Sequence, residues 1–355
     1  MTEKIEHLQQ ELHATLKQAE RNRRRTGIFR ILTYGGALVY FAGVIAFQVF
    51  TYSGGDTSFF YTPNPDPTFF ERYKMLILIA PLFILITVGG FGLGFYYRKF
   101  TEAEQNSIRR IIREMFPEAK LALLPSEVSP SLLLQSNFFG GMDSRYAGGH
   151  SFGTVIFENG DRKITFRDAV INTGKQESRL AQTSAGGLLL VFQAVFKGLF
   201  AKRVENIAGN FRGMFADARL EKKISGSVVV LPDRLESRLD YLAKNIQALK
   251  NVNGNRLVSL EDVEFERYFA VYAGDEITAR YVLTPAMMLR MTELERKYNR
   301  DMMLSFSGDR FFFAVAMPEG FLTLGSSSLT SGEALQDLYD NFAAARDILN
   351  DLKLK

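Results

Sequence analysis

The sequence predicts an α+β protein in which two N-terminal transmembrane helices precede a cytosolic domain with a largely antiparallel sheet and flanking helices. Three observations carry this prediction: two long apolar stretches, basic residues beside them, and strand patterns that interleave with helical patterns along the remaining chain. The chain has 355 residues and no cysteine, which excludes structural disulfides, thiol catalysis and thiolate metal sites.

The two apolar stretches are Ile31 to Phe50 and Met75 to Tyr97. The hydrocarbon core of a bilayer is about 30 Å thick and a helix rises about 1.5 Å per residue, so about 20 apolar residues are needed to cross it. We therefore expect transmembrane helices over 31–50 and 75–97, joined by a short extracytoplasmic loop over 51–74. Neither stretch contains an acidic side chain, a histidine, a lysine or an arginine, which argues against proton or ion coupling within one chain.

Basic residues flank the outer ends of both stretches, whereas the loop between them holds only two cations, Arg72 and Lys74. The flanking cations are Arg21, Arg23, Arg24, Arg25, Arg30, Arg98 and Lys99. By the positive-inside rule both termini are cytoplasmic, so the chain reads as a multi-pass protein of the cytoplasmic membrane. We expect these cations to contact lipid headgroups, and this reading of the net charge of +4 is preferred to nucleic-acid binding.

Two amphipathic helices are expected on the cytosolic side of the spans. In residues 1–30 an apolar stripe indicates a helix with a basic juxtamembrane end; the stripe is Ile5, Leu8, Leu12, Leu16 and Ala19. A membrane-proximal helix over 98–116 has a second stripe, which is Ile108, Ile111, Ile112 and Met115. Pro117 ends this helix.

The cytosolic α+β domain covers 117–355. One hairpin is predicted from Thr154–Phe157 and Lys163–Phe166 around the turn Asn159-Gly160, and a second from Met303–Phe306 and Arg310–Ala316. The other predicted elements are strands over Ser227–Leu231 and Phe265–Tyr272, and helices over 235–249, Thr284–Lys297 and Ser331–Leu352.

Several short blocks occur in order along this domain. They are Ser136–Phe139, Tyr146–Gly149 with Gly153, Phe211–Phe215, Leu231–Asp233, Phe265–Tyr272, Ala279–Pro285 and Leu304–Phe306. Together they resemble a bacterial family, the domain of unknown function 3137. The resemblance implies two N-terminal spans, a conserved cytosolic domain, a bacterial inner-membrane location and no assigned activity, with a LemA-type membrane protein as a partner. This chain departs from the family by having Gly149 and His150 where members carry an acidic pair.

A further departure from the family is an apolar insertion near 186–200. It is too short to span a bilayer, and Gln193 and Lys197 interrupt it. A buried helix and a helix lying in the membrane interface both fit this pattern.

Candidates for chemistry are few. The glycine-rich stretch Phe139–Gly153 lacks the Gly-Lys-Ser/Thr sequence of a phosphate-binding loop. Its Asp143, Tyr146 and His150 make it a candidate functional loop, although His150 has no metal-ligand companion at close spacing. We therefore expect no metal and no cofactor. In the second span, Gly90 and Gly94 form a G-x-x-x-G step that predicts helix packing, either between the two spans or between copies.

These features together favour a binding or scaffold module that two spans hold at the inner membrane. The alternative is a membrane-tethered hydrolase-type enzyme that uses the 139–153 loop, and the sequence leaves the question of catalytic activity open. The expected partners are the lipid bilayer, a membrane protein such as a LemA-type protein, and a second copy of the chain.

Overall fold

The computed structural model of the chain describes residues 2–53, 69–139, 148–159, 162–172, 211–220, 223–233, 255–325, 327–330 and 332–351. These residues fall into two units. The helix pair comprises the described residues of His13–Glu104, and the sheet domain comprises those of Met1–Leu12, Gln105–Gln176 and Arg203–Lys355.

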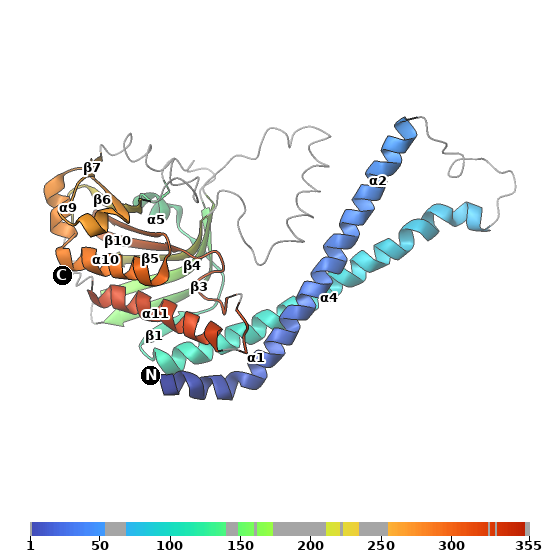
Figure 1. Ribbon diagram of the computed structural model, residues 1–355, viewed down its shortest axis with the longest axis horizontal. Helices are drawn as coiled ribbons and strands as arrows, with labels where there is room; N and C mark the ends of the chain where they lie inside the picture. Colours follow the sequence, from blue (N-terminus) through green and yellow to red (C-terminus); the bar gives the residue numbers. More distant parts are fainter. Residues whose placement is uncertain are drawn as a thin grey trace. The chain divides into compact units, whose positions relative to one another are not determined.

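Long helices build the helix pair (Figure 1). The first, α1 (Thr2–Arg30), continues through a π-helical turn, η1 (Ile31–Gly35), into α2 (Gly36–Tyr52). The second, α4 (Phe69–Met115), runs for 47 residues. The second predicted span and the predicted membrane-proximal helix are therefore one continuous helix, which ends just before Pro117 as expected.

A single ten-stranded sheet organises the sheet domain (Figure 1). Along the chain its strands are β1 (Ala119–Ala122), β2 (Ser126–Val128), β3 (Gly148–Asn159), β4 (Arg162–Asn172), β5 (Phe211–Arg219), β6 (Ser227–Pro232), β7 (Arg256–Val258), β8 (Phe269–Ala273), β9 (Met302–Ser307) and β10 (Arg310–Ala316). In space the order is β1-β3-β4-β5-β10-β9-β6-β8-β7, and β2 also pairs with β3. Every pairing between described strands is antiparallel, which confirms the predicted α+β class.

Both predicted hairpins form. In the first, β3 pairs with β4 so that Phe157 lies opposite Ile164, and a bulge between Ser151 and Thr154 interrupts the register. In the second, β9 pairs with β10 and Phe306 lies opposite Phe311. The first hairpin extends well beyond the predicted residues, because β3 continues back to Gly148.

Among the described residues, five helices flank the sheet: α5 (Pro130–Gln135), α8 (Val263–Glu266), α9 (Glu276–Val282), α10 (Pro285–Tyr298) and α11 (Glu333–Asp351). The predicted helix starting near Thr284 corresponds to α10, and the hydroxyl of Thr284 caps it by accepting from the backbone N–H of Met287 at 3.3 Å. The final predicted helix corresponds to α11. The helix expected over 235–249 lies outside the described residues.

The strand predicted over Phe265–Tyr272 is wrong in its first half. The carboxylate of Asp262 accepts from the backbone N–H groups of Glu264 and Phe265, each at 3.0 Å. This N-cap starts the short helix α8 and delays the strand β8 until Phe269. The aromatic alternation that suggested a strand therefore spans a helical turn and a strand.

Aromatic side chains fill both faces of the sheet. On the first face, Phe211, Phe215 and Phe312 pack in one cluster with Leu133 of α5 and with Phe139 just after it. On the second face a stack of rings joins the sheet to α11; the ring centroids of Phe166 and Phe321 are 6.3 Å apart, those of Phe321 and Phe342 are 4.8 Å apart, and those of Phe116 and Phe342 are 5.6 Å apart. The two faces bury a core of the size needed for an independent domain.

The start of α1 and the end of α4 belong to this domain. Leu8 and Leu12 of the predicted N-terminal stripe are buried, as is Ile108 from the stripe near the end of α4. A salt bridge joins Glu11 to Arg110 at 2.7 Å. The two stripes thus serve packing within the chain.

Candidate functional site

The helix crossing is where α4 meets the junction of α1, η1 and α2. A Cβ on Gly92 would overlap the ring of Phe29, and a Cβ on Gly89 would lie 2.7 Å from the hydroxyl of Thr33 and 3.1 Å from its backbone nitrogen. Across the same crossing, a Cβ on Gly36 would lie 3.3 Å from Ile86. Glycine is therefore required for the two helices to approach this closely.

A local distortion of the first helix accompanies this approach. The hydroxyl of Thr33 donates to the carbonyl of Phe29 at 2.8 Å, four residues earlier. Hydrogen bonding of a threonine back to the preceding turn bends helices, and the turn that contains Thr33 is the π-helical segment η1. The bend and the glycine contacts thus coincide at one level of the helix pair.

Beyond the crossing, both helices expose large apolar side chains. On α2 the exposed fractions are 62% for Val39 and 60% for Val49, and on α4 they are 67% for Phe83 and 78% for Phe91. A soluble protein rarely exposes such a contiguous apolar surface. These surfaces have the composition of helices that face lipid.

Among the described residues, one helical segment, Ala80–Met115, is long and apolar enough to cross a bilayer. The apolar helix α2 is too short to meet the same length requirement. It has 17 residues, because η1 occupies the first five residues of the predicted span. One apolar helix thus indicates membrane association.

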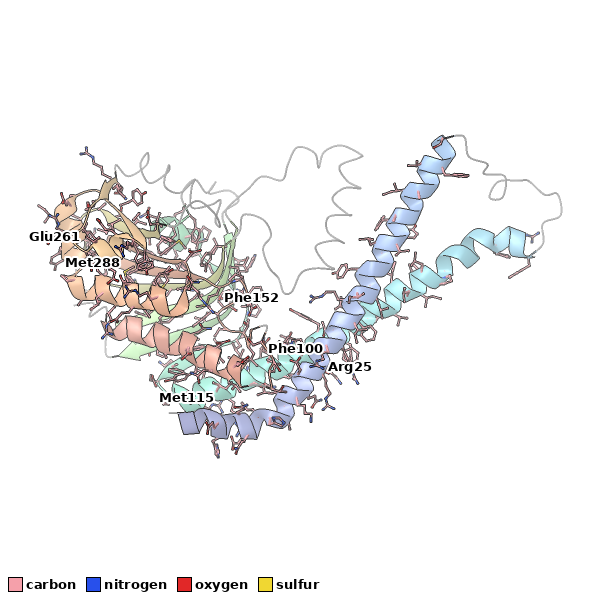
Figure 2. The ribbon with its side chains drawn as sticks, in the orientation of Figure 1. Arg25, Phe100, Met115, Phe152, Glu261 and Met288 are labelled. Atoms are coloured by element: carbon pink, nitrogen blue, oxygen red, sulfur yellow. The ribbon has the colours of Figure 1, made fainter. Side chains whose placement is uncertain are left out.

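A set of basic side chains, which we call the basic collar, lies with neighbouring aromatic rings at one end of the crossing, near Arg25 (Figure 2). The guanidinium of Arg25 lies 5.2 Å from the ring centroid of Tyr96 and donates to its hydroxyl at 3.5 Å. Tyr96 also stacks on Phe29 at 5.3 Å. One turn further along α4, the ammonium of Lys99 lies 4.4 Å from the ring centroid of Phe95. A cation over an aromatic ring is attracted to it electrostatically, and both tyrosine and basic residues are enriched near the ends of transmembrane helices.

The other predicted headgroup contacts lie on the same two helices. Arg23 and Arg24 both reach Glu20, at 2.8 and 3.3 Å, and Arg98 reaches Glu102 at 2.9 Å. Arg21 is exposed and Arg30 is half-buried. The basic collar therefore comprises Arg21, Arg23, Arg24, Arg25, Arg30, Arg98 and Lys99.

The glycine step predicted to pack helices is not the one used at the crossing. A Cβ on Gly90 or Gly94 would meet no described atom within 4 Å. The helices instead pack through the neighbouring glycines, Gly89 and Gly92. A role for Gly90 and Gly94 in contact between copies stays a prediction.

The candidate loop over 139–153 is in part a strand. His150 lies in β3, opposite Glu127 on one side and Val170 on the other, and its side chain is exposed. Asp143 and Tyr146 lie outside the described residues, as does the apolar insertion at 186–200. Gly153 is used for packing, since a Cβ there would lie 2.6 Å from Leu322.

Two ion-pair groups in the sheet were not anticipated from the sequence. On the second face, buried Asp168 accepts from Arg212 and from the backbone N–H of Phe321, the latter at 2.9 Å. On the first face, Asp217 accepts from Arg167 and from Arg310. Each group joins residues 44 or more positions apart, so no local spacing announces it. Among the described residues, no three metal-ligating side chains come together.

Comparison with known proteins supports the domain family. The model of the family described as "Protein of unknown function (DUF3137)" matches residues 209–354. The matched part holds the strands from β5 to β10 and the helices from α8 to α11. No curated protein matches the chain.

Among solved structures, the chain is similar to the crystal structure of the mycobacterial trehalose monomycolate transport factor A, TtfA. The TM-score is 0.34 and the identity 10%, over 70% of this chain and 94% of that one. A likeness at this level says nothing about function.

Proposed function

We propose that this protein is a two-span protein of the bacterial inner membrane whose cytosolic sheet domain acts as a binding or scaffold module. The observation that carries the proposal is that both helices change from basic to apolar residues at the same level, next to the helix crossing. The contacts of Arg25 and Phe29 with Tyr96 bring the first basic cluster beside Tyr96, two residues before the second basic cluster begins at Arg98. On the other side of this level, both helices expose apolar side chains.

A membrane–water interface explains this arrangement. Apolar surface is stable in the hydrocarbon region, while arginine, lysine and tyrosine concentrate at the headgroups. Two antiparallel helices that cross the same membrane–water interface must change from basic and polar residues to apolar residues at the same depth. The helix pair meets that condition with segments about 70 residues apart in the sequence, Arg25 and Tyr96 being 71 positions apart.

By the positive-inside rule, the basic collar supports an orientation in which both termini and the sheet domain lie in the cytoplasm. Tethering would then raise the local concentration of the domain for partners at the membrane surface. A LemA-type membrane protein, implied by the family resemblance, is the first protein partner to test. No contact among the described residues favours the hydrolase alternative.

Cysteine labelling tests this topology directly, because the chain has no cysteine of its own. Ser53→Cys, after the end of α2, should react with a membrane-impermeant maleimide from the outer side of the membrane in spheroplasts. Ser328→Cys, in the sheet domain, should react only after lysis. Reaction of both sites before lysis, or release of the protein by alkaline carbonate, would contradict the two-span topology.

The scaffold role needs its own experiment. The full-length protein would be solubilised in a mild detergent and captured, and copurifying proteins identified by mass spectrometry. A stoichiometric membrane partner supports the scaffold reading. A protein that emerges alone in every detergent tried would contradict it.

A further inference from the structure

The first face of the sheet carries a group of charges that the proposed anchor does not use. They lie on β1, β3, β4, β5 and β10, which are neighbours in this order in the sheet (Figure 1). We call this group the basic corner; it consists of Lys120, Lys163, Arg167, Arg219 and Arg310 with the acids Glu158 and Asp217. Strand register places them together, because residues two apart on a strand share a face and partners across strands lie opposite each other.

The acids of the basic corner neutralise only part of its positive charge. Asp217 accepts from Arg167 and from Arg310, the latter at 3.0 Å. Glu158 accepts from Lys120, and this hydrogen bond holds the pKa of Glu158 below its ordinary value, so that the carboxylate is ionised at neutral pH. Five cations therefore share two carboxylates.

Arg219 is the cation of the basic corner that neither of the two carboxylates neutralises. Its Cα is paired directly with that of Arg310 on the neighbouring strand, and like charges in this position destabilise a sheet. Arg219 is exposed, and it forms no ion pair with any described residue. Lys163, exposed as well, lies on the next strand at the same level and is 4.0 Å from Glu158. The sheet thus presents two exposed cations to an anion from outside: an arginine with no carboxylate partner among the described residues, and a lysine whose contact with Glu158 is at 4.0 Å.

We propose that the basic corner binds the phosphate groups of anionic lipid headgroups. Guanidinium groups bind phosphate oxygens through paired hydrogen bonds, and lysine adds a point charge. A phosphate would also relieve the repulsion between Arg219 and Arg310. This inference rests on the proposed function, because anchoring keeps the domain near an anionic leaflet, which attracts basic residues within a Debye length.

The test uses the full-length protein in a nonionic detergent and soluble short-chain lipids. Titration calorimetry would compare dihexanoyl phosphatidylglycerol with dihexanoyl phosphatidylcholine and with inorganic phosphate. The double variant Lys163→Gln/Arg219→Gln removes the two exposed cations and leaves the ion pairs of Asp217 with Arg167 and Arg310 intact. Its matched control is Arg256→Gln/Arg290→Gln, which removes two exposed cations elsewhere in the same domain.

We expect the wild-type protein and the control to bind phosphatidylglycerol alike, and the double variant to bind at least about tenfold more weakly. Phosphatidylcholine should bind weakly to all three. Acetylation of Lys163, followed by mass spectrometry, gives a local reading that does not depend on the variant: phosphatidylglycerol should slow it in the wild-type protein.

Equal affinity of the double variant and the control, with no protection of Lys163, would overturn the inference. Inorganic phosphate binding as tightly as phosphatidylglycerol would overturn the lipid source and point to a soluble phosphate compound. Protection of Lys163 by an acidic peptide and not by lipid would point to a protein partner instead. If cysteine labelling supports the two-span topology and the basic corner does not bind lipid, only this inference is wrong. If lipid binds and the labelling contradicts the topology, the membrane anchor is wrong and the anion site remains.

Discussion

The helix pair and the sheet domain place the same kind of side chain in opposite surroundings. Phe91 of α4 is 78% exposed, whereas Phe312 of β10 is 0% exposed. In the sheet domain, apolar residues are removed from water by one another, and charges such as Arg219 lie outside. In the helix pair large apolar side chains face outward, and the helices approach most closely where Gly89 and Gly92 lie against Thr33 and Phe29.

This inversion fits the proposed membrane anchor, in which the helix pair faces lipid and the sheet domain faces water. In water, burial of apolar surface drives packing. In a bilayer that driving force is missing, so helices associate by close van der Waals contact through small residues. Removal of an aromatic side chain should therefore destabilise the sheet domain and leave the helix pair almost unaffected, whereas enlargement of a contact glycine should destabilise the helix pair.

The largest expected contrast is between Phe312→Ala and Phe91→Ala. Removing the buried ring from β10 should lower the free energy of unfolding by about 3–5 kcal/mol, because it leaves a cavity in the first-face cluster. Removing the exposed ring from α4 should change it by less than about 0.5 kcal/mol. Urea denaturation of both variants in detergent micelles measures the contrast. A similar loss for both would mean that Phe91 is buried in the folded protein.

A second contrast lies within the helix pair, between Gly92→Leu and Gly90→Leu. Leucine at 92 would overlap Phe29 and should destabilise the crossing by about 1–3 kcal/mol, whereas the space around Gly90 is open among the described residues. A disulfide between Gly36→Cys and Ile86→Cys would report the crossing, since the chain has no other cysteine. We expect Gly92→Leu to lower its yield and Gly90→Leu to leave it unchanged. Equal yields would show that the crossing does not depend on Gly92.

The two regions also differ in how much the sequence predicts. The hairpins followed from local signals, alternation and an Asn-Gly turn, and the helix predicted over Thr284–Lys297 corresponds to α10. The strand β5 was missed because it is buried on both faces, with Phe215 and Ala216 both 0% exposed, so it has no alternation. The pairing of Asp168 with Arg212 depends on the register between β4 and β5, which no local pattern specifies.

For the helix pair, composition predicted the apolar character and the basic collar but not the contact itself. Four glycines lie between positions 89 and 94 of α4. The choice of Gly89 and Gly92 over Gly90 and Gly94 is made by Phe29 and Thr33 on the other helix. Spacing along one helix cannot contain that information, because it depends on how the partner helix is rotated.

A smaller effect is expected at the cap of α8, where the sheet domain departs from its predicted strand. Asp262→Ala removes the acceptor for two backbone N–H groups and should cost about 1 kcal/mol of unfolding free energy. The neighbouring Glu261→Ala is the control, since Glu261 is exposed and makes neither of these bonds. Urea denaturation at pH 7 compares the two. Equal stability of the variants would show that α8 starts without the help of Asp262.

The smallest expected effect is on how the stability of the sheet domain depends on pH. Burial raises the pKa of Tyr272 in the first-face cluster above its ordinary value near 10, and the charge of Asp233 acts in the same direction. The folded state therefore holds this proton more tightly than the unfolded state does. Its contribution is fully present below about pH 10 and is lost as the pH rises through the folded pKa.

Tyr272→Phe should accordingly lose less stability between pH 9 and 11 than the wild-type protein does. Tyr281→Phe is the control, because Tyr281 is 65% exposed and should leave the alkaline slope unchanged. Urea midpoints measured in half-unit steps of pH give both slopes. If Tyr272→Phe and Tyr281→Phe have the same slope, the phenol of Tyr272 reaches water in the folded state, and the first-face cluster is less closed than its packing indicates.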